Sequence, residues 1–289
     1  MKSTRFIGRI VSTLLIVAAF ASASFAVSNP LNTPRGMAVD AKGNLWVANS
    51  GANNVVAFGS NYKQLTADTV TYGISEPTDV AFDTLGNLWV TNYAANTVTE
   101  YSQGVPQPAN TITQDISSPF TIAIDGLNNI WVANYFYGGA PPLLVFEPTR
   151  DYGPANQLHM TFGTTPTVFY GVAVSDGELV LGSGLDLSFA PATVALTTGS
   201  ISGTTVGGNN FATYVAAASN GTIYFATEEN TINYATPSNL GYATQLLEVS
   251  FSITGLAVDS VHGRIYISNG ENNSIAVYDT TGKLLHTIE

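Results

Sequence analysis

The stretch Gly36-Met37-Ala38-Val39-Asp40, followed by Asn44-Leu45-Trp46-Val47-Ala48-Asn49, decides the fold because the chain repeats it. Close copies occupy 79–83 with 87–92 and 121–125 with 129–134; weaker copies begin at Gly171 and Tyr214, and the last at Gly255. The fifth residues of the copies fall at 40, 83, 125, 175, 218 and 259, which gives steps of 41 to 50 residues. Short apolar strands at a period of about 40–50 residues are typical of propeller blades rather than helical solenoids. We therefore expect an all-β, six-bladed β-propeller of four-stranded antiparallel blades.

Each repeat reads as four strands with different roles. The third residue of the first strand is alanine in every copy (Ala38, Ala81, Ala123, Ala173, Ala216 and Ala257), as expected where neighbouring blades converge on a common axis. The second strand carries a large ring (Trp46, Trp89, Trp131, Tyr224 and Tyr266) that can fill the wider space between adjacent sheets. We expect third strands such as 97–101 and polar outer strands such as 69–72 and 284–288.

The turn between the first two strands has its own pattern. Asp40 opens it and Gly43 stands near its end, and Asp83 with Gly86 repeats the arrangement. An aspartate at this position accepts a backbone N–H two residues on, and glycine supplies a positive φ. One carboxylate per turn is too few for calcium, which takes six to eight oxygen ligands.

These residues resemble the NHL repeat and its relatives. The match in the first copy is carried by Pro34, Gly36, Asp40, Gly43, Asn44, Val47, Asn49, Asn54 and Val55. The family usually has aspartate where this chain has Asn49, Asn92, Asn134 and Asn269. The resemblance implies a six-bladed propeller. Relatives of this architecture include lactone hydrolases of the gluconolactonase type, streptogramin lyases, amidating lyases and non-catalytic scaffolds, and fold alone does not choose among them.

The first 26 residues have the features of a secretory signal peptide. Lys2, Arg5 and Arg9 precede an apolar run from Ile10 to Phe20, and small residues follow at 21–26. We therefore expect residues 1–26 to be removed, residues 27–289 to form the propeller, and the protein to be secreted or periplasmic. The apolar run is about half the roughly 20 residues of a membrane-spanning helix, so no membrane span is expected after removal. The chain has no cysteine and therefore no disulfide.

The charge balance is acidic. Nine Lys and Arg stand against 20 Asp and Glu, and removal of the signal peptide leaves six basic residues, a net charge of −14. An acidic chain without a basic cluster is repelled by nucleic acid, so we exclude nucleic-acid binding. We expect a monomer without a cofactor.

A candidate site lies at the axial mouth of the expected ring, at the start of the innermost strands. The repeat register places there Arg35, Thr78, Asp79, Phe120, Tyr135, Phe136, Tyr170, Thr213, Tyr214 and Thr254. The three histidines fall outside this set, so no nucleophile–base pair and no metal site emerges from the register. We interpret Arg35 and Asp79 as an ion pair. The aromatic insertion at 134–142 suits either ligand contact or packing over the next blade.

Rings beside hydroxyl and amide groups suit a glycan or a peptide. The first hypothesis is an exported, non-catalytic binding or interaction scaffold for such a ligand. The alternative is a metal-assisted lactone hydrolase or lyase, and a third is a purely structural envelope protein. Two modes of ring closure stay open: packing between the first and last blades, or an outer strand added to the last blade by residues 27–33.

Overall fold

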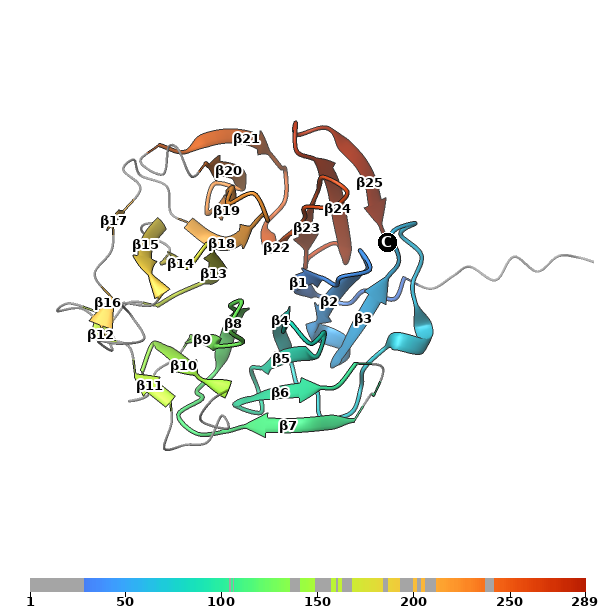
Figure 1. Ribbon diagram of the computed structural model, residues 1–289. Helices are drawn as coiled ribbons and strands as arrows, with labels where there is room; N and C mark the ends of the chain where they lie inside the picture. Colours follow the sequence, from blue (N-terminus) through green and yellow to red (C-terminus); the bar gives the residue numbers. More distant parts are fainter. Residues whose placement is uncertain are drawn as a thin grey trace, which may run out of the picture.

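The computed structural model describes residues 29–103, 105, 107–135, 141–148, 157–159, 161–162, 168–183, 187–192, 200–201, 204–205, 212–236 and 242–289. Within these ranges the expected six-bladed β-propeller is confirmed, because six antiparallel sheets surround a common axis (Figure 1). No helix in the described ranges has the length and apolar character needed to cross a bilayer. The expected signal peptide and Phe136 lie outside the described residues.

Every blade begins at the axis with its first strand and runs outward. Blade 1 contains β1 (Pro34–Val39), β2 (Leu45–Asn49) and β3 (Asn54–Phe58), and blade 2 contains β4 (Pro77–Phe82), β5 (Leu88–Asn92), β6 (Thr97–Tyr101) and β7 (Pro108–Ile112). Blade 3 contains β8 (Pro119–Ile124), β9 (Ile130–Asn134), β10 (Leu143–Phe146) and β11 (Gln157–His159). Blade 4 contains β13 (Gly171–Ser175), β14 (Glu178–Gly182), β15 (Leu187–Pro191) and β17 (Thr204–Thr205).

The remaining strands complete the ring. Blade 5 contains β18 (Ala212–Ala217), β19 (Ile223–Thr227), β20 (Thr231–Ala235) and β21 (Thr244–Glu248), and blade 6 contains β22 (Ile253–Asp259), β23 (Arg264–Asn269), β24 (Ser274–Asp279) and β25 (Leu284–Ile288). A small parallel sheet pairs β12 (Thr161–Phe162) with β16 (Ser200–Ile201). Two short 3₁₀ helices, Ser50–Ala52 and Thr66–Asp68, both lie in blade 1.

Blade 1 differs from the expected four strands. The predicted outer strand at 69–72 is wrong, because only single bridges tie this segment to β3: Val70 pairs with Val55, and Gln64 pairs with Phe58. Between the two bridges the chain forms the 3₁₀ turn at Thr66–Asp68, which takes the backbone out of the ladder. The predicted outer strand at 284–288 is confirmed as β25.

The alanines of the first strands lie directly opposite the large rings of the second strands. Ala38 pairs with Trp46, Ala81 with Trp89, Ala123 with Trp131, Ala216 with Tyr224 and Ala257 with Tyr266. Opposite residues of an antiparallel pair share one face of the sheet, with Cβ atoms about 5 Å apart. A methyl group therefore leaves room for the neighbouring ring. This is a second reason for alanine at these positions, in addition to the crowding of the first strands at the axis.

The aspartate of each turn fixes the first hairpin of its blade. The Asp40 carboxylate accepts the backbone N–H groups of Lys42 and Asn44 at 2.8 and 2.9 Å, as the turn pattern predicts. It also accepts the indole N–H of Trp46 at 3.0 Å. Asp83 and Asp125 repeat the bonds, with Trp89 and Trp131 as indole donors. The turn thus also orients the ring that packs between blades.

The six hydrophobic clusters of the described residues each lie between two consecutive blades. The cluster between blades 6 and 1 closes the ring and includes Leu31, which is 3% exposed and packs with Tyr266, Ile275 and Val277 of blade 6. Residues 29–33 form no strand. Ring closure therefore follows the first alternative, packing between the end blades.

At three blade boundaries, an asparagine side chain of one blade accepts a hydrogen bond from the backbone of the next blade. Asn53 and Asn96, both with positive φ, accept backbone N–H bonds from Glu76 and Ser118 of the following blade at 2.7 and 2.6 Å. Asn273 of blade 6 accepts the same bond from Thr33 at 2.7 Å. The chain ends are thus joined as consecutive blades are.

Replacement of Ala123 by leucine tests the pairing of small and large residues. Ala123→Leu should destabilise the fold by about 1–3 kcal/mol, because added methylenes must displace the buried ring of Trp131. Ala109→Leu on the exposed face of β7 is the control and should change stability by less than about 0.5 kcal/mol. Denaturant unfolding measures both, and equal effects would contradict the arrangement.

Ring closure has its own test. Leu31→Ala should lower the free energy of unfolding by about 2–5 kcal/mol, because it opens a cavity between the first and last blades. Leu285→Ala on β25, where the side chain is 45% exposed, is the control and should be nearly neutral. A neutral Leu31→Ala variant would show that the segment before β1 does not hold the ring together.

Candidate functional site

The mouth of the propeller is shaped by irregularities at the start of the first strands. Register shifts occur between Pro34 and Met37 in β1, and at the matching places of β4, β8, β18 and β22. A β-bulge turns a side chain away from its regular direction. In this chain the bulges hold residues that the repeat register assigns to the mouth.

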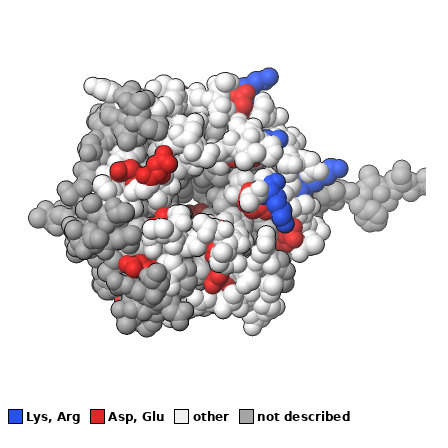
Figure 2. Space-filling model, in the orientation of Figure 1, with Lys and Arg blue, Asp and Glu red and all other residues white. Residues whose placement is uncertain are grey.

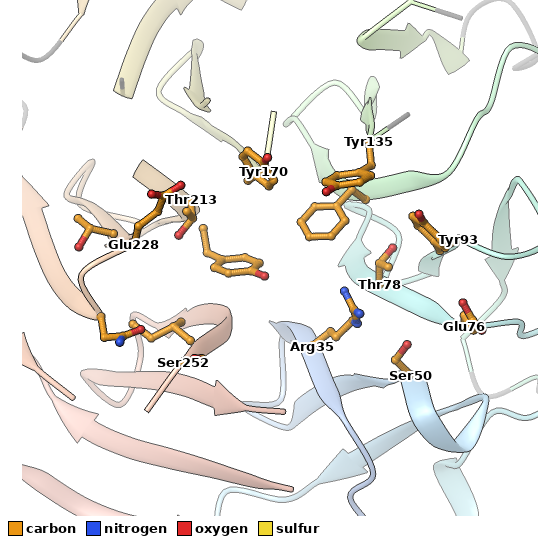
Figure 3. A pocket seen from close by; sticks show the side chains of 15 residues that line it. Arg35, Ser50, Glu76, Thr78, Tyr93, Tyr135, Tyr170, Thr213, Glu228 and Ser252 are labelled. Carbon is orange, nitrogen blue, oxygen red and sulfur yellow. The ribbon is translucent and has the colours of Figure 1, made fainter. Parts of the chain in front are cut away.

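These residues surround an axial cavity of about 540 Å³ (Figure 3). It is lined by Arg35, Ser50, Glu76, Thr78, Tyr93, Phe120, Tyr135, Tyr170, Thr213, Tyr214, Thr227, Glu228, Asn230, Ser252 and Ile253. The opposite face of the ring, shown in Figure 2, carries basic side chains beside blades 1 and 6, whereas acidic ones are distributed around it. The volume of the cavity suits a small ligand or one unit of a polymer.

One wall of the cavity is an aromatic cluster. The Phe120 ring lies 5.5 Å from Tyr135, 5.9 Å from Tyr170 and 6.2 Å from Tyr214, measured between ring centroids. Tyr93 extends the cluster at 6.4 Å from Tyr135. Burial raises the pKa of Tyr214 to about 12, so its hydroxyl stays a hydrogen-bond donor at neutral pH.

Arg35 faces the cavity from blade 1. Its guanidinium points into the opening toward the side of Thr78 and Tyr135 (Figure 3). The Arg35 Nε is buried and has no hydrogen-bond partner among the described residues. A buried unsatisfied donor is uncommon in folded proteins and marks a position where a ligand acceptor would be stabilised.

Asp79 lies below the mouth, in a cavity of about 20 Å³. Its Oδ2 accepts the Thr121 hydroxyl at 2.9 Å and the Ile122 backbone N–H at 3.1 Å, both from blade 3, and its Oδ1 accepts the Val80 N–H. The interpretation of Asp79 and Arg35 as an ion pair is therefore wrong: the carboxylate joins blades 2 and 3 instead. Burial raises its pKa from 3.8 to about 7.

The structure places the ten candidate mouth residues in four ways. Seven line the axial cavity: Arg35, Thr78, Phe120, Tyr135, Tyr170, Thr213 and Tyr214. Asp79 lies beneath it. The Thr254 hydroxyl bonds to the Pro34 carbonyl at 2.7 Å and so holds blade 6 to blade 1. Phe136 lies outside the described residues.

The repeat register missed further lining residues: Ser50, Glu76, Thr227, Asn230, Ser252 and Ile253. Glu76 and Ser252 each stand two residues before a register position, so a slightly longer window would have included them. Ser50 follows β2 directly and Thr227 ends β19, the part of the repeat where the second strand reaches the mouth.

The described residues contain no group of three or more His, Asp or Glu side chains positioned to hold a metal ion. The histidines stand elsewhere: His159 on β11, His262 in the turn before β23 and His286 on β25. The Asp79 oxygens are occupied by the hydrogen bonds described above. Among the described residues, the mouth therefore offers rings, hydroxyls, the Arg35 cation and the carboxylates of Glu76 and Glu228, without a group of three side chains that could hold a metal.

Comparisons with known proteins support the fold. The family model described as "NHL repeat" matches residues 31–58. A search of curated protein sequences found no match. Among solved structures, a gluconolactonase from Xanthomonas campestris is similar with a TM-score of 0.67 and 12% identity, covering 84% of each chain.

Two further solved structures show the same likeness. A chain of a nidogen/laminin complex has a TM-score of 0.66 and 14% identity, covering 82% of this chain and 90% of that one. A streptogramin B lyase has a TM-score of 0.60 and 12% identity, covering 91% of this chain and 85% of that one. At these identities the likeness shows the fold alone. The chain is thus a six-bladed β-propeller that carries an NHL repeat. It is an NHL-like propeller, distantly similar to gluconolactonase and streptogramin-lyase propellers.

The buried Asp79 predicts a pH dependence of stability. The folded protein keeps the carboxyl proton up to about pH 7, whereas an unfolded chain releases it near pH 3.8, so the folded state binds more protons between these values. The contribution of Asp79 to the free energy of unfolding should therefore fall as pH rises from about 4 to 8. Denaturant unfolding of wild type and Asp79→Asn across this range measures it. A constant difference between the two proteins would contradict the raised pKa.

Proposed function

We propose that this chain is an exported, non-catalytic binding scaffold that holds a short glycan segment at the axial mouth. The proposal that it is exported is supported by the signal-peptide pattern of residues 1–26. The single observation that carries the binding proposal is the aromatic cluster of Phe120, Tyr135, Tyr170 and Tyr214 facing Arg35 across the cavity.

The chemistry of the mouth supports a sugar ring as the ligand. Aromatic faces stack on the apolar face of a sugar, and Tyr135 is 39% exposed, so its ring is available for such contact. Thr78, Ser50 and Asn230 supply hydroxyl and amide groups that orient ligand hydroxyls. A peptide bound through the same rings is the other ligand class that this surface suits.

The second candidate is a metal-assisted lactone hydrolase or lyase. Its support is the fold likeness to a gluconolactonase and a streptogramin B lyase, together with a carboxyl of raised pKa below the mouth. The hydrogen bonds that occupy Asp79 do not fit a metal ligand. The geometry of the mouth therefore favours the binding scaffold over this second candidate.

Glycan and peptide arrays probed with purified protein test the binding proposal. Tyr135→Ala should weaken glycan binding by about two- to tenfold, because loss of a stacking ring costs about 0.5–1.5 kcal/mol. Tyr242→Ala, at a tyrosine 73% exposed and absent from the cavity lining, is the matched control.

Two outcomes would contradict the proposal. Retention of peptides alone would replace the glycan by the other ligand class. A stoichiometric divalent ion in the purified protein, lost in Asp79→Asn, would favour the enzyme instead.

A further inference from the structure

A second cavity, of about 260 Å³, lies between blades 1 and 2. Its lining includes the turns Asp40–Asn44 and Asp83–Gly86, which follow the first strands, so it opens on the face opposite the mouth. It forms beside the 3₁₀ turn that replaces the outer strand of blade 1, and Ala67, Asp68 and Val70 of this segment contribute to its wall. The cavity thus exists where blade 1 departs from the repeat.

Comparison of the repeats shows that the tryptophan beside this cavity is more exposed than its equivalents in the next two blades. Trp89 and Trp131 occupy the same repeat position as Trp46 and are both 0% exposed. Trp46 is partly exposed and lines the cavity. Its ring meets the edge of Phe82, with centroids 5.7 Å apart and planes at 74°. The open space therefore has an aromatic wall that is covered in the two neighbouring interfaces.

The opposite wall is also apolar. Leu88 and Tyr101 of blade 2 contribute to it, although they are only 4% and 2% exposed. The Tyr101 hydroxyl donates to the Tyr72 carbonyl at 2.8 Å, so its polar end is satisfied. Val105 stands at the rim and is 48% exposed. The interior can accept a flat ring without leaving a protein polar group unpaired.

The rim is negatively charged. Asp40, Asp68 and Asp83 line the cavity against one cation, Lys42. Neutral donors hold Asp40 and Asp83 in place and do not cancel their charge. Asp68 forms no side-chain hydrogen bond or ion pair with a described residue. Burial and the nearby Asp83 charge raise the pKa of Glu100, which is consistent with a negative potential here.

We propose that this cavity, independent of the axial mouth, is a binding site for a small aromatic amine. The ring would lie against Trp46 and Phe82, which are both partly exposed, and the protonated amine would lie at the acidic rim near Asp68. A cation next to an indole face gains further electrostatic attraction. The volume of about 260 Å³ lies below the range of typical ligand pockets, which starts at about 300 Å³, so the ligand is limited to a single ring with a short side chain.

Tryptophan fluorescence tests the proposal, because Trp46 is the one of the three tryptophans that lines this cavity. Titration of the whole protein with 2-phenylethylamine should give a saturable change in emission. 2-Phenylethanol, which has the same ring without the charge, should bind about three- to tenfold more weakly, and 3-phenylpropionate more weakly still. Trp46→Phe should remove the emission change.

Calorimetry of cavity variants completes the test. Ala67→Phe, at an exposed residue of the rim, should fill the cavity and abolish binding, whereas Ala109→Phe on β7 is the matched control and should bind as wild type does. Asp68→Asn should reduce the preference for the amine over the alcohol. No saturable change, unaltered binding to Ala67→Phe, or equal affinity for amine and alcohol would each overturn the proposal. Since none of these variants lies in the mouth, failure here leaves the glycan proposal standing.

Discussion

The whole structure depends on packing between consecutive blades. Five of the six blades present a large ring of the second strand to the next blade, as Trp89 and Trp131 do, and blade 4 presents Val180. Every hydrophobic cluster of the described residues joins two blades. A single blade cannot bury such a ring alone, so stability arises from the set of interfaces, as in other repeat proteins. Because the ring is closed, Leu31 and Asn273 must complete the interface between blades 6 and 1. This requirement explains why the segment before β1 is ordered although it forms no strand.

Closure of the ring also determines where ligand chemistry can occur. At the axis the first strands approach so closely that a side chain at Gly36 would collide with Asp79, and one at Gly255 with the Arg35 backbone. Glycine is therefore required where strands touch. At the start of the first strands, the bulges turn side chains away from the regular ladder. Arg35, Phe120 and Tyr214 lie at these bulges and line the mouth. The same geometry that crowds the axis thus opens the mouth.

Much of the fold could be predicted because its signals are local and repeated. The period, the alanine opposite each ring and the Asp turn lie within a dozen residues of one another. The shortened outer edge of blade 1 could not be predicted in this way, because 69–72 has the polar pattern of an outer strand and the 3₁₀ turn precedes it. The mouth was predicted in part: the register found the residues at the bulges, but Glu76 and Ser252 lie just upstream. Contacts between blades, such as Asp79 with Thr121, are invisible in one repeat.

A residue that departs from the repeat can be compared with the equivalent residues of the other copies in the same chain. Asn49 replaces the aspartate usual in NHL repeats, and its amide both accepts from Asn32 N–H and donates to the Pro30 carbonyl. An ionised aspartate has no donor for the second bond, so this substitution has a structural reason. Trp46 is partly exposed where the 3₁₀ turn replaces the outer strand of blade 1, whereas the equivalent rings of Trp89 and Trp131 are fully covered. An exposed indole costs hydrophobic stabilisation of about 25 cal/mol per Å² of apolar surface. Trp46 lacks this stabilisation, whereas Trp89 and Trp131 have it. A ligand that covers the Trp46 ring would therefore gain the free energy of burying this apolar surface.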